Sequence, residues 1–437
     1  MKKIIALFAV ALVAVALTLF FNRSDEQKWK TSDVIYEVNI RQYTPEGTFN
    51  AFTKELPRLK ELGVDIIWIM PISPIGVEGR KGTLGSYYSI VDYTAVNPEF
   101  GTLDDFKTLV KKAHELNLKV IIDWVANHTS RDAVWLKNGH KDWYVWDTAT
   151  DAPAVKYDWT DIAQLDYTNR DMRAEMVKCM KFWLTEADID GFRCDVAGEV
   201  PTDFWNETVP ELRKVKENLF MLAEAEKPEL MNFAFDVYYS WGLHNAMNEV
   251  AQGKENVNAI RKQIARMIND FPQSAIPMYF TSNHDENSWK GSEFERMGEG
   301  TEAFAALTYT LPGVPLIYSG QEAGFDRSLS FFEKDSIDWT GPNAAKWTEF
   351  YKKMNDLREK HPALHSYPDG GTFGEVMTSE HDNVYAFVRI IPGDTVICFF
   401  NFSDKEIPCA FACPRDGSDK MLPLKPWEYS ITTYGKN

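Results

Sequence analysis

Carboxylate, histidine and arginine side chains gather at the ends of several apolar, strand-like stretches of this sequence. They are Asp123, Asn127 and His128 after one stretch, Arg193 and Asp195 in the next, Glu224 after another, and His284 and Asp285 after a fourth. Paired carboxylates can supply a nucleophile and a general acid/base, while histidine and arginine bind hydroxyl groups and anions. If these groups share one rim, they could carry out nucleophilic and acid/base chemistry on one bound substrate.

The spacing of apolar residues predicts the elements that would bring these side chains together. Strands are predicted at residues 34–39, 65–70, 119–125, 190–195, 219–224, 233–237, 278–283 and 315–318. Helices are predicted at residues 51–62, 103–116, 170–187, 204–217, 257–268, 302–309 and 345–360. Eight strands, nearly all followed by helices, predict an α/β fold, a (β/α)8 TIM barrel. In such a barrel the carboxyl ends of the strands carry the active site.

Two segments depart from this alternation. Residues from about 128 to 169, after the third strand, are rich in Trp, Tyr and Asp and lack helical periodicity, which predicts a short inserted domain beside the site. Its Trp143 and Trp159 either stack on a substrate or form the core of the insertion. Four strand-like runs with turn residues between them predict a C-terminal antiparallel β-sandwich domain at 361–437, which leaves 25–360 for the barrel.

The amino terminus has the pattern of a leader. Two lysines precede an apolar run at residues 4–21, broken only by Thr18, and polar residues follow. Residues 1–24 are therefore predicted to be a signal peptide or an N-terminal membrane anchor, because the run is just long enough to span a bilayer. Both alternatives predict an exported protein that is periplasmic, secreted, or anchored in the membrane and facing outward.

Charge and cysteine content exclude several classes of partner and site. The 64 acidic and 47 basic side chains leave a formal net charge of −17, which would repel nucleic acids and anionic membrane surfaces. A neutral, ring-shaped substrate suits the 14% of aromatic residues better. The five cysteines form no C-x-x-C pair, which argues against structural zinc and redox sites, and their odd number leaves at least one thiol free.

The polar residues belong to motifs that together resemble the α-amylase family of glycoside hydrolases (glycoside hydrolase family 13). In chain order the motifs are residues 63–71 (GVDIIWIMP), 88–93 (YSIVDY), 123–128 (DWVANH), 191–195 (GFRCD), Glu224, 283–285 (NHD) and 313–322 (GVPLIYSGQE). Each motif alone has little specificity, but all of them occur in order around the predicted strands. The resemblance covers nearly the whole chain after the leader and implies the same barrel fold.

The resemblance also implies roles in a reaction that retains the configuration of the sugar. Asp195 would be the nucleophile, Glu224 the general acid/base, and Asp285 would stabilise the oxocarbenium-like transition state. Arg193 lies two residues before Asp195 on the same face of the strand, where its positive charge can keep Asp195 ionised. The substrate-binding residues implied are Tyr88, as a stacking platform, Asp123, His128, Arg193 and His284.

Some assignments have alternatives. Glu226 has the same strand parity as Glu224 and would be the acid if the fifth strand ended one register later, although Glu224 directly ends the apolar run. Glu322 is expected to be a structural carboxylate that bonds backbone amides. Cys194 is expected to pack in the barrel wall rather than to take part in chemistry.

The calcium site of the family is only partly present. In calcium-dependent members the resemblance implies a ligand at Asn127 and a Lys-His pair after the nucleophile, whose place is taken here by Gly198-Glu199. Asn127 is therefore either a calcium ligand or a pin between the insertion and the barrel, and no cofactor is expected to be required. Val196 occurs in relatives that cleave 1,6-linkages, but residues 162–166 match no such relative closely, so the linkage stays open.

The sequence therefore predicts an exported retaining α-glucan hydrolase, of α-amylase or α-glucosidase type, that acts on starch fragments or malto-oligosaccharides. The alternatives are a glucosyltransferase of the same family, and a non-catalytic protein that binds glycans or serves as the heavy chain of a transporter. The intact set of Asp195, Glu224 and Asp285 argues against a non-catalytic protein, because holding like charges together costs stability.

Overall fold

The computed structural model describes residues 29–435. The predicted leader at residues 1–24, with its apolar run at 4–21, lies outside the described residues, so both alternatives for it stay predictions. Within 29–435 no helix is both long enough and apolar enough to cross a membrane.

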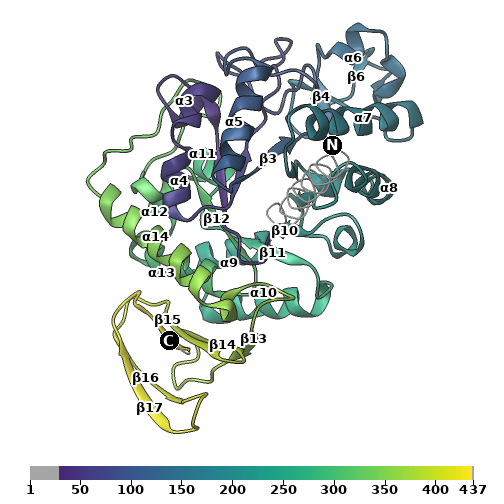
Figure 1. Ribbon diagram of the computed structural model, residues 1–437. Helices are drawn as coiled ribbons and strands as arrows, with labels where there is room; N and C mark the ends of the chain where they lie inside the picture. Colours follow the sequence, from purple (N-terminus) through teal and green to yellow (C-terminus); the bar gives the residue numbers. More distant parts are fainter. Residues whose placement is uncertain (1–28, 436–437) are drawn as a thin grey trace, which may run out of the picture.

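Eight parallel strands close into a barrel, which confirms the predicted fold class (Figure 1). They are β1 (Ile35–Val38), β2 (Ile66–Ile69), β3 (Lys119–Trp124), β8 (Gly191–Cys194), β9 (Phe220–Ala223), β10 (Val237–Tyr239), β11 (Ile276–Tyr279) and β12 (Val314–Tyr318). Each strand pairs with the barrel strands before and after it in the chain, and β1 closes the ring against β12.

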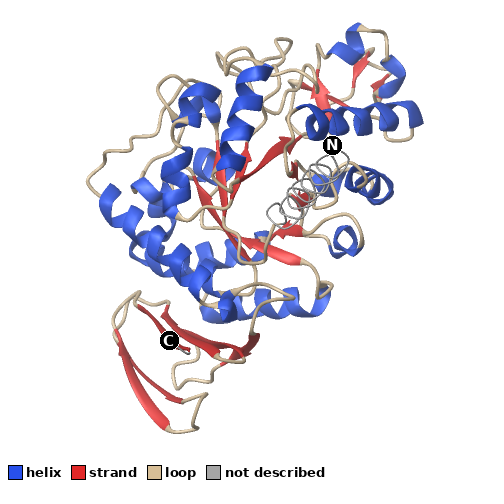
Figure 2. Ribbon diagram, in the orientation of Figure 1, coloured by secondary structure: helices blue, strands red, loops and turns tan. Residues whose placement is uncertain are grey.

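Most of the helices cover the outer face of this barrel (Figure 2). In chain order the helices are α2 (Ile40–Tyr43), α3 (Phe49–Thr53), α4 (Leu56–Leu62), α5 (Leu103–Glu115), α7 (Arg170–Glu186), α8 (Thr202–Arg213), α9 (Trp241–Ala251), α10 (Val257–Asp270), α11 (His284–Lys290), α12 (Glu293–Met297), α13 (Thr301–Thr310) and α14 (Ala344–Lys360), with α6 (Val134–Lys137) in the insertion. The start of α11 is fixed by Asn283, whose side chain accepts a hydrogen bond from the backbone of Glu286. Residue 283, which was predicted to end a strand, is therefore a helix cap. The observed strand, β11, starts two residues earlier than predicted and ends at Tyr279.

The sixth strand and several helices differ from the sequence prediction: the helix predicted at 51–62 is divided into α3 and α4, and α9, α11 and α12 were not predicted. The prediction places the strand at 233–237, whereas β10 starts at Val237. Residues Pro228–Asn232 form a 3₁₀ turn, and the next residue, Phe233, is 71% exposed, so the apolar residues before β10 do not extend the sheet. Helix α9 was missed because glycine, histidine and asparagine residues interrupt its apolar stripe.

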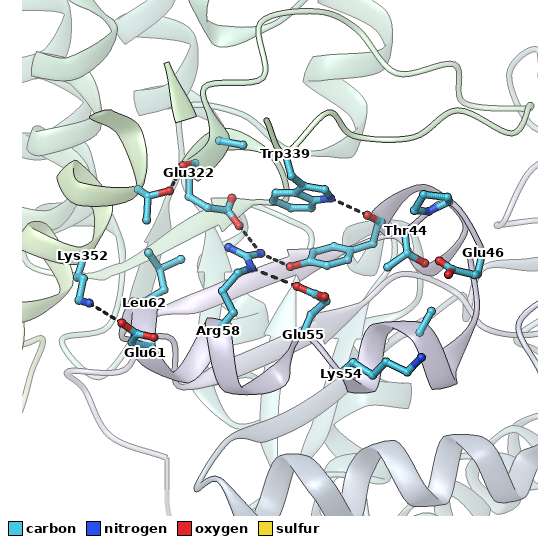
Figure 3. A pocket seen from close by; sticks show the side chains of 15 residues that line it. Thr44, Glu46, Lys54, Glu55, Arg58, Glu61, Leu62, Glu322, Trp339 and Lys352 are labelled. Carbon is cyan, nitrogen blue, oxygen red and sulfur yellow. Dashed lines mark hydrogen bonds and ion pairs between the residues drawn. The ribbon is translucent and has the colours of Figure 1, made fainter. Parts of the chain in front are cut away.

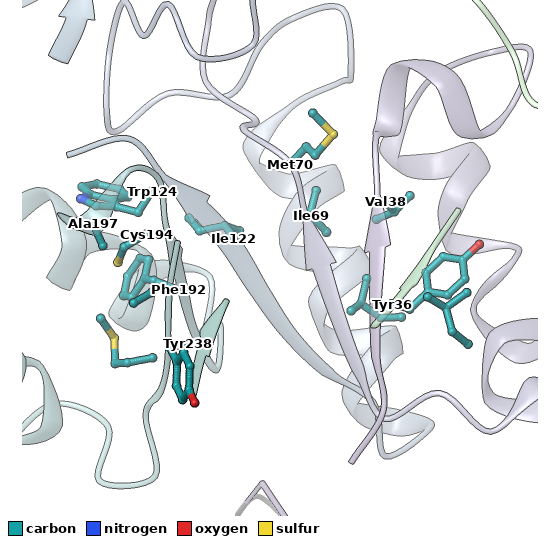
Figure 4. Packing of buried hydrophobic residues seen from close by; sticks show 14 of the residues in the cluster. Tyr36, Val38, Ile69, Met70, Ile122, Trp124, Phe192, Cys194, Ala197 and Tyr238 are labelled. Atoms are coloured by element: carbon teal, nitrogen blue, oxygen red, sulfur yellow. The ribbon is translucent and has the colours of Figure 1, made fainter. Parts of the chain in front are cut away.

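Alternation along the strands divides the core into two layers. In β1, Ile35 packs with the side chains that fill the barrel, whereas Tyr36 and Val38 pack between the strands and the helices (Figure 4). Successive side chains of a strand point to opposite faces. Alternation therefore turns Glu37 toward the barrel interior, where it is fully buried.

The same rule places the charged residues of β8. Phe192 and Cys194 belong to the outer core layer, so Cys194 packs in the wall as expected (Figure 4). Arg193, between them, faces the barrel interior and is fully buried. Asp195 follows at the carboxyl end of the strand and faces the same side.

The segment between β3 and α7 folds over this end of the barrel. Its antiparallel pairs are β4 (His128–Ser130) with β7 (Ile162–Gln164) and β5 (Trp146–Asp147) with β6 (Ala152–Pro153). Because the first pair begins at His128, four residues after β3 ends, the insertion is tied directly to the barrel rim.

The residues after α14 form two antiparallel sheets. One has the order β13 (Thr372–Glu375), β14 (Val384–Ile391), β15 (Asp394–Asn401) and β18 (Tyr429–Gly435), and the other pairs β16 (Ile407–Ala412) with β17 (Asp419–Leu424). A shared apolar cluster joins the sheets. The sequence missed β13 and β17 because their residues are mostly exposed and show no clear apolar alternation. All five cysteines have free thiols.

Candidate active site

Arg193 lies at the centre of the charged groups at the carboxyl end of the barrel. Its Nη1 donates to Asp123 Oδ1 at 2.9 Å and to Asp195 Oδ1 at 3.2 Å. Its Nη2 lies 2.9 Å from Glu224 Oε1 in an ion pair whose alignment falls short of a hydrogen bond. Carboxylates from three neighbouring strands therefore share one buried guanidinium.

The backbone after Asp195 positions Glu224. Val196 has φ of 36° and ψ of 45°, a left-handed conformation that β-branched residues rarely adopt. In this conformation its N–H donates to Glu224 Oε2 at 2.6 Å. Backbone strain of this kind is found where the surrounding structure holds a functional group in place.

Burial and like charges raise the pKa of both carboxyl groups. Burial, followed by the nearby Glu224, raises the pKa of Asp195 well above its usual range, although Arg193 lowers it. Burial also raises the pKa of Glu224, with Arg193 lowering it and Asp285 raising it further. Two carboxyl groups in such contact titrate as a pair, because ionisation of one raises the pKa of the other. A nucleophile and a general acid need one ionised and one protonated member of such a pair.

His284 joins the carboxylates to the wall of the site. Its Nε2 lies 2.7 Å from Tyr88 Oη and 3.4 Å from Asp285 Oδ2, and its Nδ1 donates to Glu37 Oε1. Burial alone would lower the pKa of His284, but Asp285 and Glu37 raise it to about 9. His284 is therefore positively charged at neutral pH.

Asp123 holds several of these groups in position. It accepts hydrogen bonds from Tyr88 Oη at 3.1 Å and Trp68 Nε1 at 3.2 Å, besides those from Arg193. Tyr88 in turn stacks on His284 with ring centroids 5.4 Å apart. The side chain of Asp123 is fully covered, which suits a support beneath the site.

The catalytic candidates Asp195, Glu224 and Asp285 line one cavity of about 460 Å³. Tyr88, His128 and His284 also line it, whereas Asp123 and Arg193 lie beneath its surface. Burial lowers the pKa of His128 to about 4, so this imidazole is neutral at neutral pH. The sequence-predicted site residues are thus brought together around one space.

Aromatic side chains form two walls of this cavity. Trp159, from the insertion, lies against His128 with ring centroids 5.5 Å apart. On the other wall Phe331 packs on Trp289, which is 57% exposed. Trp143 instead packs inside the insertion, away from the cavity, so the two tryptophans left open by the sequence differ in location.

The geometry favours Glu224 over Glu226 as the acid. Glu226 Oε2 accepts a hydrogen bond from the backbone of Gly242 at 2.9 Å, and Oε1 lies 3.6 Å from Arg266. Glu226 does not line the cavity that contains Asp195. These two contacts hold the Glu226 side chain against helices α9 and α10 instead.

Glu322 lies in a separate cluster at the side of the barrel, next to a second cavity of about 490 Å³ (Figure 3). It accepts hydrogen bonds from Tyr36 Oη at 2.5 Å and from the backbone of Gly320 at 3.1 Å, and Arg58 Nη2 lies 3.1 Å away. These contacts fit the structural role expected from the sequence.

The donor set around Asn127 does not fit a calcium ion. Gln164 Nε2 donates to Asn127 Oδ1 at 3.0 Å and to its backbone oxygen at 3.2 Å. A calcium ion binds oxygen atoms, but here both oxygens already face an amide N–H group. Among residues 29–435 no three His, Cys, Asp or Glu side chains are arranged to hold a metal ion. The arrangement favours the second alternative, a polar pin between the insertion and the barrel.

A family model described as "Alpha amylase, catalytic domain" matches residues 17–338. The chain belongs to the alpha-amylase family. The family match spans the barrel, the insertion and every candidate site residue.

Several known proteins are similar to this chain over most of its length. "Alpha-amylase MalA" of Haloarcula japonica is 28% identical over 410 residues, which cover 90% of this chain and 59% of that protein. A "4-alpha-glucanotransferase" of Thermotoga neapolitana is 26% identical, with 80% of this chain and 84% of that protein covered. The crystal structure of the maltogenic alpha-amylase AmyB of Thermotoga neapolitana has a TM-score of 0.81 and 29% identity, over 93% of this chain and 97% of that one.

Sequence reasoning missed several residues of the site. Among them are Glu37, Trp68, Tyr239, Trp289 and Phe331. Glu37 had a signal, since it is a charged residue inside an apolar strand. Tyr239 bonds Arg193 Nε at 3.3 Å, but a tyrosine in a strand does not stand out from other core residues. Trp289 had no signal that separates it from other surface aromatics.

Proposed function

We propose that this protein is a retaining α-glucan hydrolase of the alpha-amylase family. The observation that carries the proposal is the contact of one guanidinium, that of Arg193, with both Asp195 and Glu224. Neighbouring nitrogen atoms of a guanidinium hold these carboxylates close together. Retaining enzymes need a separation of about 5–5.5 Å, whereas inverting enzymes need a wider gap for water.

In the proposed reaction Asp195 Oδ attacks the anomeric carbon, and Glu224 gives its proton to the leaving glycosidic oxygen. The C–O bond to the leaving sugar breaks as the bond to Asp195 forms, which leaves a glycosyl-enzyme. Glu224, now ionised, takes a proton from water, whose oxygen displaces Asp195. Two inversions at one carbon restore the α-configuration.

The remaining cavity residues would bind the sugar and its developing positive charge. Asp285, 37% exposed in its side chain, faces the space next to Asp195 and His284. His284 would donate to sugar hydroxyls as a cation, and neutral His128 would complement it from the insertion. Tyr88 would stack on the sugar ring. The wall of Trp289 and Phe331 offers apolar area for further glucose units of the chain.

Product analysis tests this proposal. The protein from about residue 25 onward would be incubated with maltoheptaose, panose and pullulan, and the anomer released first would be followed by proton NMR. We expect α-configured short oligosaccharides, and the ranking of substrates would give the linkage preference. Release of the β-anomer would contradict Asp195 as a nucleophile, and absence of turnover would contradict the enzyme assignment.

A glucanotransferase is the second candidate. It is favoured by the similarity over 390 residues to a protein named as a 4-alpha-glucanotransferase. Transfer and hydrolysis use the same glycosyl-enzyme and differ in whether sugar or water accepts the glycosyl group. Longer products formed from maltotriose, at a rate above that of reducing-end release, would favour transfer.

We also propose export of the protein by its leader, on the basis of the apolar run at residues 4–21. Fractionation of expressing cells tests this proposal. Recovery of the protein outside the cytoplasmic membrane or in the membrane fraction is expected, and recovery only from the cytoplasm would contradict it.

A further inference from the structure

Glu37 is a buried carboxylate inside the barrel that the reaction above does not use. It is fully buried on β1, beneath the floor of the cavity. Its Oε1 accepts the Nδ1–H of His284, whereas Oε2 has no hydrogen-bond partner among the residues that the structure describes. A buried carboxylate is costly unless a partner compensates it, so the pairing with His284 is the feature to explain.

We propose that Glu37 is a positioning residue that orients His284 and holds its Nε2–H at the cavity wall, between Tyr88 and Asp285, where a sugar hydroxyl would enter. The proposal rests on the glucan hydrolase function proposed above. When one nitrogen of an imidazole bonds a carboxylate, the proton and the direction of the other nitrogen are fixed as well. The Nε2 atom of His284 lies at the cavity wall, 2.7 Å from Tyr88 Oη and 3.4 Å from Asp285 Oδ2, so an entering sugar hydroxyl would share its N–H with Tyr88.

The charged and titratable groups around His284 come from every packed element. They are Glu37 on β1, Tyr88 in the loop after β2, Asp123 on β3, Arg193 on β8, Glu224 after β9, and the adjacent Asp285. Arg193 and burial oppose the imidazolium, and Asp285 favours it from the solvent side. Glu37 is the carboxylate that hydrogen-bonds the ring from below. Without the Glu37 carboxylate, the partly exposed Asp285 would be the main group that favours the charged form of His284.

The arrangement has a consequence for the reaction. A charged N–H donor makes a stronger hydrogen bond to a sugar hydroxyl than a neutral donor does. Bonds to the sugar hydroxyls strengthen as the transition state forms, so a loss of orientation at His284 should appear in kcat more than in KM. Replacement of a residue that only fills the barrel would not lower kcat selectively over KM.

The first test titrates His284 by NMR in the full chain from residue 25 onward, with His284→Asn used to assign its signals. We expect a protonated Nδ1 and a titration near pH 9 in the unaltered protein. In Glu37→Gln the titration should move down by about one to two pH units, because the opposite charge is lost. Glu37→Asp keeps the charge and should restore part of this shift.

Glu322→Gln is the matched control. Glu322 is equally buried and ion-paired, but its partners are Arg58 and Tyr36, away from the cavity. It should leave the His284 titration unchanged, even if both variants lower Tm. An unchanged His284 titration in Glu37→Gln, or an equal shift in Glu322→Gln, would overturn the proposal. If Glu37→Gln does not fold, a neutral or Nε2-only protonated His284 in the unaltered protein at pH 7 would overturn it.

The second test uses the substrate found by product analysis. Glu37→Gln should lower kcat about ten- to hundredfold with little change in KM, whereas Glu322→Gln should leave both within about twofold. An unchanged kcat in Glu37→Gln would overturn the role in the reaction. If the unaltered protein turns over no glucan, the proposed function fails, while the NMR titration still decides whether Glu37 orients His284.

Discussion

Two clusters in this barrel place an arginine among carboxylates and aromatic rings, and their difference separates chemistry from structure. In the catalytic cleft Arg193 contacts three carboxylates, and three aromatic rings lie within 6 Å of its guanidinium. In the outer cluster Arg58 contacts two carboxylates and lies over the rings of Tyr43 and Trp339 (Figure 3). The residue types are nearly the same.

The clusters differ in charge balance and in exposure. Five carboxylates surround the cleft, against Arg193 and a charged His284. They are Glu37, Asp123, Asp195, Glu224 and Asp285. In the outer cluster Arg58 is 36% exposed in its side chain, and Glu55 beside it is 38% exposed, so water screens that group. An uncompensated, buried excess of one charge marks the catalytic cluster, since stability alone would not select it.

Asp195→Asn should show the largest effect. We expect kcat on maltoheptaose to fall by at least ~10⁴-fold, because the amide cannot attack the anomeric carbon. Sugar binding should survive, since the cavity keeps its shape. Steady-state kinetics and calorimetric titration with the same oligosaccharide would measure both. Residual activity within a hundredfold of the original would remove Asp195 from the role of nucleophile.

Glu322→Gln should perturb the outer cluster around Arg58, and it should lower stability rather than turnover. Glutamine keeps an acceptor oxygen for Tyr36 but loses the charge that pairs with Arg58, and we expect the free energy of unfolding to fall by about 1–3 kcal/mol. Turnover should stay within twofold. Denaturant unfolding and kinetics on one preparation would measure both quantities. A large loss of kcat with an unchanged midpoint would join the outer cluster to the active site.

Trp289→Ala should change affinity for chain length rather than chemistry. Trp289 is 57% exposed on the cavity wall, where apolar area is available to a glucan chain. We expect KM for maltoheptaose to rise about two- to tenfold, with kcat little changed, because a stacked aromatic ring contributes about 0.5–1.5 kcal/mol. Phe233→Ala is the control, since Phe233 is even more exposed, at 71%, but lies outside the cavity. Equal effects of the two substitutions would contradict a binding role for Trp289.

Asp195→Asn should also raise Tm at neutral pH, in contrast to Glu322→Gln. The pKa of Asp195 is raised in the folded protein, first by burial and then by Glu224, so the ionised form opposes folding. A carboxyl group of this kind contributes stability that is present below its unfolded pKa and is lost as pH rises through the folded pKa. The gain in Tm, about 1–3 °C, should therefore grow as the pH rises above the unfolded pKa and disappear near pH 4. A gain independent of pH would show another cause.

The charged residues of the site could be predicted from the sequence better than the aromatic residues that line the cavity. Asp195 and Glu224 end apolar strands, and a charge in that position has few structural explanations. Glu37 is also a charged residue in an apolar strand, but it lies inside the barrel rather than at its rim. Its partner His284 is 247 positions away in the chain, so the sequence does not reveal the pairing. Trp289 and β10 depend on how loops fold back on the barrel, and local periodicity does not record such contacts.

Chelation should have the smallest effect. Gln164 Nε2 donates to both oxygens of Asn127, and these hydrogen bonds tie the insertion to the barrel. We propose that EDTA leaves activity and Tm unchanged. Gln164→Ala should lower Tm by about 1–3 °C, because Asn127, which is fully buried, then loses a donor. If EDTA instead lowers Tm and added calcium restores it, Gln164 must move aside to admit the ion. The amide pin would then be a feature of the metal-free protein alone.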